Sequence, residues 1–302
     1  MKRKRLSQVI ASVLICLGLT IALPAGAAQP HYRFALLLST INNPYFVAMK
    51  EAAEKEAKAL GVDLQVLDAA NSSTTQVNQI QSMLAKNVDL LLVNPTNADT
   101  IVPAIKQANQ ANVPVIFLDR NANGGHALAF FASDNVEAGR IACGFIARKL
   151  GGKGRVAELT GVPGASATVE RTKGCKEVLD ANPGLKLVAQ QTANFDRSQG
   201  LDVMQNIITA NPQGIDALFA ENDEMALGAV KALKAAKILD KTLVVSIDGT
   251  PDGLAAVKKG EISLDVGQQP ALMSKLGIAA GYNYLKSKTL FVPVPLKQYT
   301  AK

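Results

Sequence analysis

Short apolar runs alternate regularly with longer stretches of helical periodicity, and this alternation limits the fold of the chain more than any other feature of the sequence. Nine runs rich in Leu, Val, Ile and Ala are predicted strands: residues 34–39, 62–68, 89–94, 114–119, 156–160, 187–191, 217–220, 243–248 and 262–266. Helical stretches separate them, the first from about residue 44 to 60. Strands that are apolar along their whole length are typical of parallel sheets covered by helices on both faces. The sequence therefore predicts an α/β fold with doubly wound parallel sheets.

The alternation is too long for one typical domain, because it extends over about 230 residues. Residues 121–126 (NANGGH) interrupt it with the composition of a loop, and four predicted strands lie before them and five after. We therefore predict two doubly wound parallel-sheet lobes of similar size.

Residues 1–28 have the pattern of a secretory signal peptide. A basic KRKR segment precedes an apolar run at residues 9–23, and small residues follow it up to Ala27 and Ala28. We expect cleavage after Ala27 or Ala28 and export to the periplasm. The apolar run is short for a membrane span, so an uncleaved membrane anchor is the less favoured alternative.

The net charge of +7 follows largely from this segment. Four of the 32 basic residues and none of the 25 acidic residues lie in residues 1–28, which leaves a charge of +3 on the mature chain. Such a small excess argues against a nucleic acid partner. An oxidising compartment permits Cys143 and Cys175 to pair, and two buried thiols are the alternative. With two His and three Cys in the whole chain, neither a zinc site nor any other metal or cofactor is expected.

Polar residues follow most of the predicted strands at their carboxyl ends, where ligands bind in open parallel sheets. These residues are Ser39, Asp68, Asn94, Asp119, Arg120, Asn222, Asp223, Asp248 and Gln268. A carboxylate accepts hydrogen bonds from two hydroxyls and a guanidinium donates to two oxygens, which suits the adjacent hydroxyls of a sugar. Capping of the following helices is the alternative role for Ser, Asp and Asn. The whole series of strand ends, with Arg and Gln among them, favours a binding cleft.

Three aromatic residues fall in the same loops. Tyr45 and Phe46 follow the first predicted strand, and Phe195 follows the run at residues 187–191. Aromatic faces pack against the apolar C–H face of a sugar ring, so we expect these rings beside the ligand, with ordinary core packing as the alternative.

A series of motifs resembles the ribose-type periplasmic sugar-binding proteins over essentially the whole mature chain. The motifs, in order, are residues 39–46 (STINNPYF), 94–96 (NPT), 118–120 (LDR), 132–135 (ASDN), 195–197 (FDR), 222–229 (NDEMALGA) and 248–253 (DGTPDG). The resemblance implies two α/β lobes, joined by three crossing strands at a hinge, that close over one monosaccharide. It also implies a monomer that delivers the sugar to the membrane permease of an ABC importer, and it allows a chemotaxis receptor as a second partner.

The resemblance also assigns the lobes and the ligand contacts. It implies an N-terminal lobe at residues 29–133 plus 269–297 and a C-terminal lobe at residues 134–268 plus 298–302. The implied ligand contacts are Ser39, Asn43, Tyr45, Phe46, Asn94, Asp119 and Arg120 in the first lobe, Arg171, Phe195, Asn222 and Asp248 in the second, and Gln268 at the hinge. Arg171 has the least similar flanks. Tyr45 departs from the family, in which Phe is common, and its hydroxyl is a polar atom that the site must satisfy.

D-Ribose is the favoured ligand, and another pentose, a hexose, a polyol or a furanosyl signal is the alternative within the class. An enzyme on a doubly wound fold is disfavoured, because the chain lacks the G-x-x-x-x-G-K-[ST], G-x-G-x-x-G and G-x-S-x-G motifs. A transcriptional regulator of the lactose-repressor type would carry a DNA-binding helix-turn-helix where this chain has the predicted signal peptide.

Overall fold

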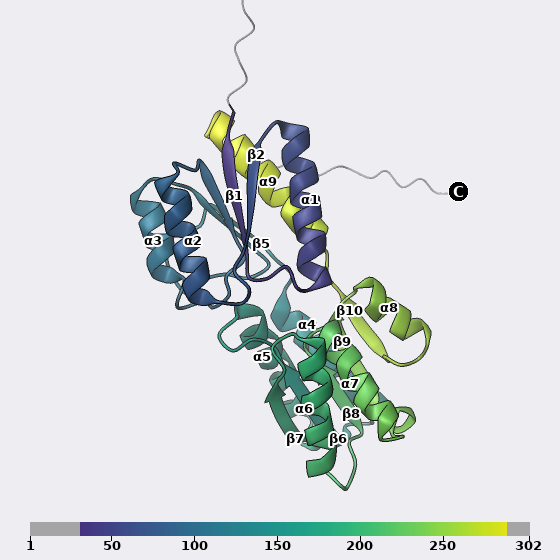
Figure 1. Cartoon of the computed structure of the whole chain (residues 1–302). Helices are drawn as coiled ribbons and strands as arrows, with labels where there is room; N and C mark the ends of the chain where they lie inside the picture. Colours follow the sequence, from purple (N-terminus) through teal and green to yellow (C-terminus); the bar gives the residue numbers. More distant parts are fainter. Residues whose placement is uncertain (1–30, 289–302) are drawn as a thin grey trace, which may run out of the picture. The chain divides into compact units, whose positions relative to one another are not determined.

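The computed structural model of the chain describes residues 31–288, and the predicted signal peptide lies outside this range. Within it, ten strands form two five-stranded sheets that are parallel throughout, with helices on both faces of each sheet (Figure 1). The prediction of two doubly wound α/β lobes is confirmed. None of the helices in residues 31–288 is long and apolar enough to cross a lipid bilayer.

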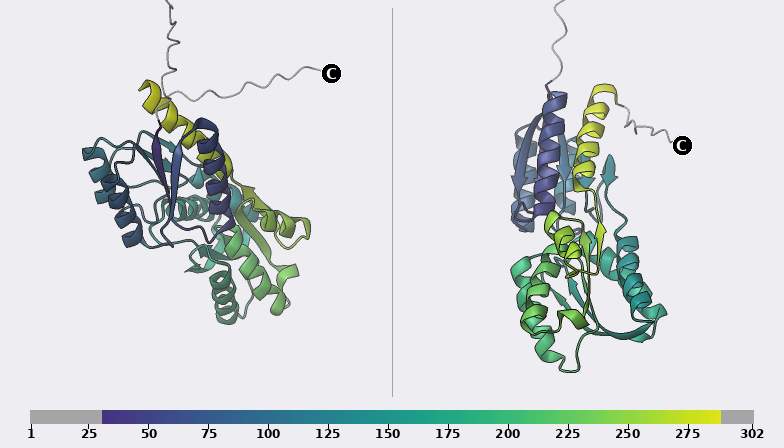
Figure 2. Two further views of the ribbon diagram at one scale, coloured as in Figure 1. Left: turned by 45° about the horizontal axis from the view of Figure 1, so that its top comes forward. Right: turned by 90° about the vertical axis from the view of Figure 1, so that its right-hand side faces the viewer.

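The first sheet has the strand order β2-β1-β3-β4-β5. Its elements are β1 (Arg33–Leu38), α1 (Pro44–Leu60), β2 (Asp63–Asp68), α2 (Ser73–Ala85), β3 (Leu90–Val93), α3 (Val102–Gln110), β4 (Val115–Leu118), β5 (Ala129–Phe131) and α9 (Pro270–Ser287). On β1, Phe34, Leu36 and Leu38 pack toward α1 and α9, which lie side by side (Figure 2). The alternate residues Ala35 and Leu37 pack toward α2 and α3. Burial on both faces explains why the strand is apolar along its length.

The second sheet has the strand order β10-β9-β8-β6-β7. Its elements are α4 (Asn135–Lys149), β6 (Lys153–Thr160), α5 (Ser166–Ala181), β7 (Gly184–Thr192), α6 (Arg197–Ala210), β8 (Ala217–Ala220), α7 (Asp223–Ala235), the short 3₁₀ helix η1 (Leu239–Lys241), β9 (Leu243–Asp248), α8 (Pro251–Lys258) and β10 (Leu264–Gly267). Leu218 and Ala220 of β8 pack toward α6 and α7, and Ala217 and Phe219 pack toward α4 and α5. The two sheets are therefore built on the same plan.

The strand boundaries differ from the predicted ones where the sequence carries no apolar signal. β5 is missing from the prediction, because it has three residues and lies half-exposed at the edge of its sheet. β6 and β7 begin at Lys153 and Gly184, earlier than the predicted residues 156 and 187. The early parts of both strands include exposed residues such as Lys186. Their backbone pairing continues beyond the part of the strand that is buried.

Two segments of the described chain pass from one sheet to the other. Residues 132–134 join β5 to α4, and Gln268 and Gln269 join β10 to α9. The predicted third crossing segment lies outside the described part of the chain. The two lobes also touch directly, since the backbone amide of Ala98 donates to the carbonyl of Gly164 at 2.9 Å.

Helices α4 and α5 pack closely and are joined by a disulfide. Gly139 of α4 and Gly174 of α5 lie at the contact, and a Cβ atom on either would overlap a carbonyl oxygen of the other helix. Cys143 and Cys175 are buried and form a disulfide across the same contact, with a Cα–Cα distance of 5.1 Å. Of the two alternatives that the sequence left open, the structure has the disulfide.

Removal of this disulfide should destabilise the folded protein, because it links residues 32 positions apart and so restricts the unfolded chain. We expect Cys143→Ala/Cys175→Ala to lower the free energy of unfolding of the mature protein by about 3 kcal/mol in urea denaturation. Reduced wild-type protein should lose a similar amount. Thiol titration of denatured, non-reduced mature protein should find no free thiol at either cysteine, and two free thiols would contradict the pairing.

Candidate functional site

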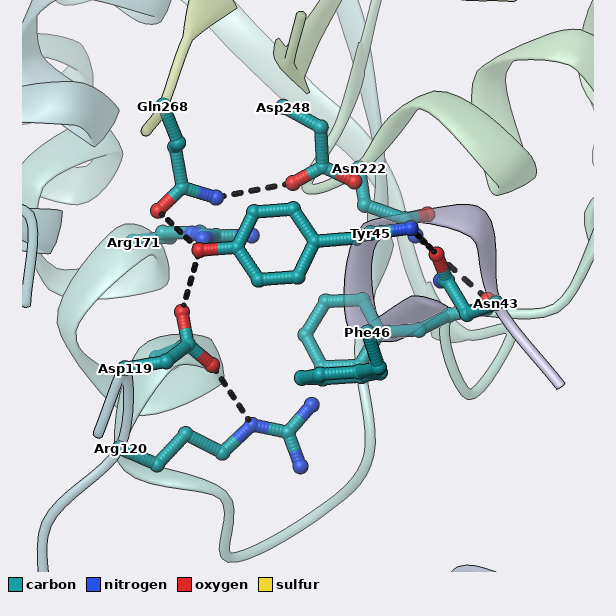
Figure 3. Close-up of a pocket in the computed structure, with 11 residues that line it drawn as sticks. Asn43, Tyr45, Phe46, Asp119, Arg120, Arg171, Asn222, Asp248 and Gln268 are labelled. Carbon is teal, nitrogen blue, oxygen red and sulfur yellow. Dashed lines mark hydrogen bonds and ion pairs between the residues drawn. The ribbon is translucent and has the colours of Figure 1, made fainter. Parts of the chain in front are cut away.

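The carboxyl ends of both sheets border one cavity (Figure 3). Parallel pairing puts the carboxyl ends of all strands of a sheet at the same edge, so the loops that follow the strands meet there. The lining residues are Asn43, Tyr45, Phe46, Asp119, Arg120, Ala167, Arg171, Phe195, Asn222, Asp248 and Gln268.

Ten of the twelve predicted ligand contacts line this cavity, and Ser39 and Asn94 do not. Asn94 Nδ2 donates to Asp119 Oδ2 at 3.0 Å, and Asn94 Oδ1 accepts from the backbone amide of Ser39 at 3.1 Å. These two residues therefore lie behind Asp119 and position its carboxylate. Ala167, near the start of α5, lines the cavity although the sequence analysis does not name it, because a small apolar residue carries no signal of its own.

The start of α1 directs two aromatic rings into the cavity. Asn43 has an extended backbone, and its Oδ1 accepts a hydrogen bond from the amide of Tyr45 at 2.9 Å, which caps the helix. Pro44 then occupies the first helical turn, where its missing N–H costs nothing. Tyr45 and Phe46 are both buried, with their rings edge to face at 5.2 Å. Asn43 is thus both a helix cap and a wall residue.

Asp119 and Arg120 form the charged wall of the first lobe. Both are buried, and Arg120 Nε lies 3.6 Å from Asp119 Oδ2. The Arg120 guanidinium lies 5.2 Å from the ring centroids of both Phe46 and Phe195, within the range of cation–π attraction. Its Nη1 reaches the Pro95 carbonyl at 3.5 Å, and its Nε has no hydrogen-bond partner among the described residues. Burial lowers the pKa of Arg120, and the guanidinium has donors available for a ligand.

Arg171 and Phe195 form the facing wall in the second lobe. Arg171 is buried and donates from Nε to Asn135 Oδ1 at 2.9 Å and from Nη1 to the Glu221 carbonyl at 2.6 Å. The guanidinium lies 5.8 Å from the centroid of the Phe195 ring. Phe195 has a left-handed backbone with φ of +59°, and its ring packs on Gly161, where a Cβ atom would overlap the ring. Glycine at this position therefore leaves the space that the ring needs.

The second lobe also supplies a carboxyl group and an amide, and the crossing segment adds a second amide. Asp248 ends β9 with φ of +144°, and Gln268 Nε2 donates to its Oδ1 at 2.8 Å. Asn222 caps α7 through its Oδ1, which accepts from the amide of Met225 at 3.0 Å. Burial raises the pKa of Asp248 well above its ordinary value, and the charge of Arg171 opposes this rise. The cavity wall has two carboxyl and two guanidinium groups, and together they offer hydrogen-bond donors and acceptors to a polar ligand.

A pair of buried acids lies beside the cavity in the second lobe, and no sequence pattern marked it. Glu158 on β6 accepts a hydrogen bond from Gln190 Nε2 at 2.7 Å. Glu221 accepts from Thr172 Oγ1 and from the amide of Gly161, both at 2.7 Å. Burial raises the pKa of Glu158 to about 7, and burial together with the charge of Glu158 raises the pKa of Glu221 to about 8.

These acids should make the folded protein less stable as the pH rises. Below about pH 4.5 both carboxyls are protonated in the folded and unfolded states, so burial costs little there. Above it, the unfolded chain releases protons that the folded protein retains until the pH passes the raised pKa values. We expect the free energy of unfolding to decline between about pH 5 and pH 8, and Glu158→Gln, which imitates the neutral acid, to remove about 2 kcal/mol of that decline.

Urea denaturation of both proteins across this pH range measures the effect. The matched control is Glu51→Gln, which changes an exposed acid on α1 and should leave the pH profile as it is in the wild type. A decline of equal size in the wild type and in Glu158→Gln would contradict the raised pKa of Glu158.

Comparison with known proteins agrees with this architecture. The profile of a family described as Periplasmic binding protein domain matches residues 34–289. The chain belongs to the periplasmic binding protein family. Ribose import binding protein RbsB of Salmonella typhimurium is 41% identical to it, over 98% of this chain and 97% of that protein.

Solved structures of other family members share the fold. The Caulobacter myo-inositol binding protein bound to myo-inositol matches with a TM-score of 0.84 at 34% identity, over 87% of this chain and 90% of that chain. A periplasmic solute binding protein of an ABC transporter from Actinobacillus succinogenes, with bound D-allose, matches with a TM-score of 0.79 at 33% identity, over 87% of this chain and 93% of that chain.

Proposed function

We propose that this chain is a periplasmic solute-binding protein that captures one monosaccharide, D-ribose before others, and delivers it to the membrane permease of an ABC importer. The observation that carries the proposal is the cavity at the carboxyl ends of both sheets, walled by paired charges, amides and aromatic rings. The similarity to RbsB over nearly the whole chain supports ribose. Family members with bound myo-inositol and D-allose leave another pentose, a hexose, a polyol or a furanosyl sugar as the alternative.

The wall matches a sugar in both its polar rim and its apolar faces. Phe46 and Phe195 both line the cavity, each with its ring centroid 5.2 Å from the Arg120 guanidinium, and aromatic rings offer flat surfaces to the C–H face of a sugar. Asp119 and Asp248 accept hydrogen bonds from hydroxyls, and the guanidinium donates to hydroxyl oxygens with charge-assisted strength.

Closure of the lobes follows from the way in which the wall is divided. Asp119 and Arg120 belong to the first lobe, and Arg171 and Asp248 belong to the second. A sugar held by one lobe gains the contacts of the other only when the lobes meet, so it binds the closed form better than an open form. We propose lobes of residues 29–133 plus 269–297 and 134–268 plus 298–302, with the crossing segments as the hinge.

Binding without turnover fits the wall better than catalysis does. Asp119 accepts hydrogen bonds from protein donors on both oxygens, and Asp248 accepts one from Gln268. These bonds fix both carboxyl groups in place, where they can accept hydrogen bonds from a ligand. Within residues 31–288, no group of three His, Cys, Asp or Glu side chains is arranged to hold a metal ion. We also propose, from the resemblance to the family, a monomeric carrier without cofactor or enzymatic activity, with a chemotaxis receptor as a second partner.

Loss of either charged residue in the first lobe should weaken sugar binding. We expect Asp119→Ala and Arg120→Ala each to raise the Kd for D-ribose by at least about tenfold in calorimetric titration, because each removes charge-assisted hydrogen bonds in a buried site. Asp202→Ala and Arg148→Ala are the matched controls, since both residues are exposed and lie outside the cavity.

A thermal-shift screen of the wild type against pentoses, hexoses and polyols comes before the titration and identifies the sugar to use. The proposal fails if no sugar stabilises the protein. The site assignment fails if Asp119→Ala and Arg120→Ala bind the identified sugar as tightly as the two controls do.

Export can be tested on the native protein. We expect the protein released from cells by osmotic shock to begin at Ala28 or Gln29, because cleavage is predicted after Ala27 or Ala28. Intact-mass measurement distinguishes this mature form from the full chain. Protein that remains with the membrane fraction at full length would instead support the uncleaved anchor.

A further inference from the structure

The hydroxyl of Tyr45 occupies the cavity wall at the point where the two lobes meet. It donates a hydrogen bond to Asp119 Oδ1 at 2.7 Å, and it lies 3.3 Å from Gln268 Oε1 (Figure 3). A phenol has a single proton, and the shorter contact to a carboxylate takes it. Gln268 is fixed separately, since its Nε2 donates to Asp248. The phenol oxygen, which also lies 3.8 Å from Met273 Sδ, therefore keeps its acceptor capacity at the cavity wall.

This hydroxyl also uses part of the hydrogen-bonding capacity of Asp119. A carboxylate oxygen accepts about two hydrogen bonds. Asp119 Oδ2 accepts one hydrogen bond, from Asn94 Nδ2 at 3.0 Å, and Arg120 Nε lies 3.6 Å from it as an ion-pair partner. Oδ1 has one place left once Tyr45 has donated to it. With Phe at position 45, Oδ1 would have two places for ligand hydroxyls, and the space that the phenol oxygen takes would be open to a ligand substituent.

Tyr45 is held too firmly to move aside for a larger ligand. Its side chain is 5% exposed, its ring lies edge to face against Phe46, and it packs with Met49 and the rest of the core between α1 and the first sheet. Burial and the neighbouring carboxylates raise its pKa well above the ordinary value, so the hydroxyl keeps its proton, and the hydrogen bond to Asp119 orients it. An oxygen fixed at this position occupies space that a ligand substituent would otherwise take.

We infer that the Tyr45 hydroxyl determines specificity in this cavity, by taking the place of one ligand substituent and so favouring a five-carbon sugar over six-carbon relatives. The inference rests on the proposed function and adds to it the residue that limits ligand size. D-Allose and D-ribose make a suitable pair of probes, because the pyranose form of D-allose is that of D-ribose with one added hydroxymethyl group. Myo-inositol is a second six-carbon probe.

The test compares Tyr45→Phe with the wild type by calorimetric titration of D-ribose, D-allose and myo-inositol. The wild type should bind D-ribose at least about tenfold more tightly than either six-carbon ligand. In Tyr45→Phe, the ratio of the six-carbon Kd to the ribose Kd should fall by at least about fivefold for D-allose or for myo-inositol. The matched control is Tyr282→Phe, which removes a hydroxyl on α9 away from the cavity and should leave all three Kd values unchanged.

A purely structural role for the hydroxyl predicts a different result, in which Tyr45→Phe changes the affinity for all three ligands by the same factor. Ratios within about twofold of the wild type, or a wild type that prefers a six-carbon ligand, would overturn the inference. Loss of all binding by a Tyr45→Phe variant that still unfolds cooperatively would overturn it as well. A wild type that binds no sugar at all is a separate outcome, because it contradicts the proposed function itself.

Discussion

Parallel pairing of the strands is the constraint on which the rest of this structure depends. Neighbouring parallel strands run in the same direction, so the chain must cross back over a face of the sheet before the next strand begins. Here helices form these crossovers. Consequently, the loops after successive strands collect at one edge of each sheet. The cavity residues are separated in sequence by more than 200 positions, from Asn43 to Gln268, yet they share one wall because all except Arg171, which lies in the second turn of α5, follow or end a strand or begin the helix after it.

The same regularity explains how much could be predicted from the sequence. Strands buried on both faces have a local signal, and five of the nine polar residues predicted at strand ends line the cavity, whereas Asn43 and Arg171 were assigned by the resemblance alone. Capping and wall-forming were alternatives for Asn222, and the structure shows that this residue caps a helix and lines the cavity, as Asn43 also does. A cap must sit at the start of a helix, and in a parallel sheet that start lies at the carboxyl edge.

Features that depend on contacts between distant segments could not be predicted in this way. β5 exists because β4 offers an edge to pair with, and its three residues have no periodicity of their own. Glu158 and Glu221 are buried together only because β6 and β8 are neighbours, which the order of strands along the chain does not state. The disulfide depends on the close approach of α4 and α5, for which Gly139 and Gly174 are required but give no pairing signal.

Three wall residues, Asp119, Phe195 and Asp248, have positive φ values, a conformation that costs of order 1–3 kcal/mol for a residue other than glycine. The folded chain bears this cost before any ligand arrives, because the strands and helices on either side fix the backbone. A ligand therefore meets two carboxyl groups and a ring that already point inward, and little of its binding energy is used to order them. Glycine at any of these three positions would relieve the backbone strain of the folded protein and would also remove a side chain from the cavity wall. The same three residues therefore lower the stability of the folded protein through backbone strain and raise its affinity for a ligand.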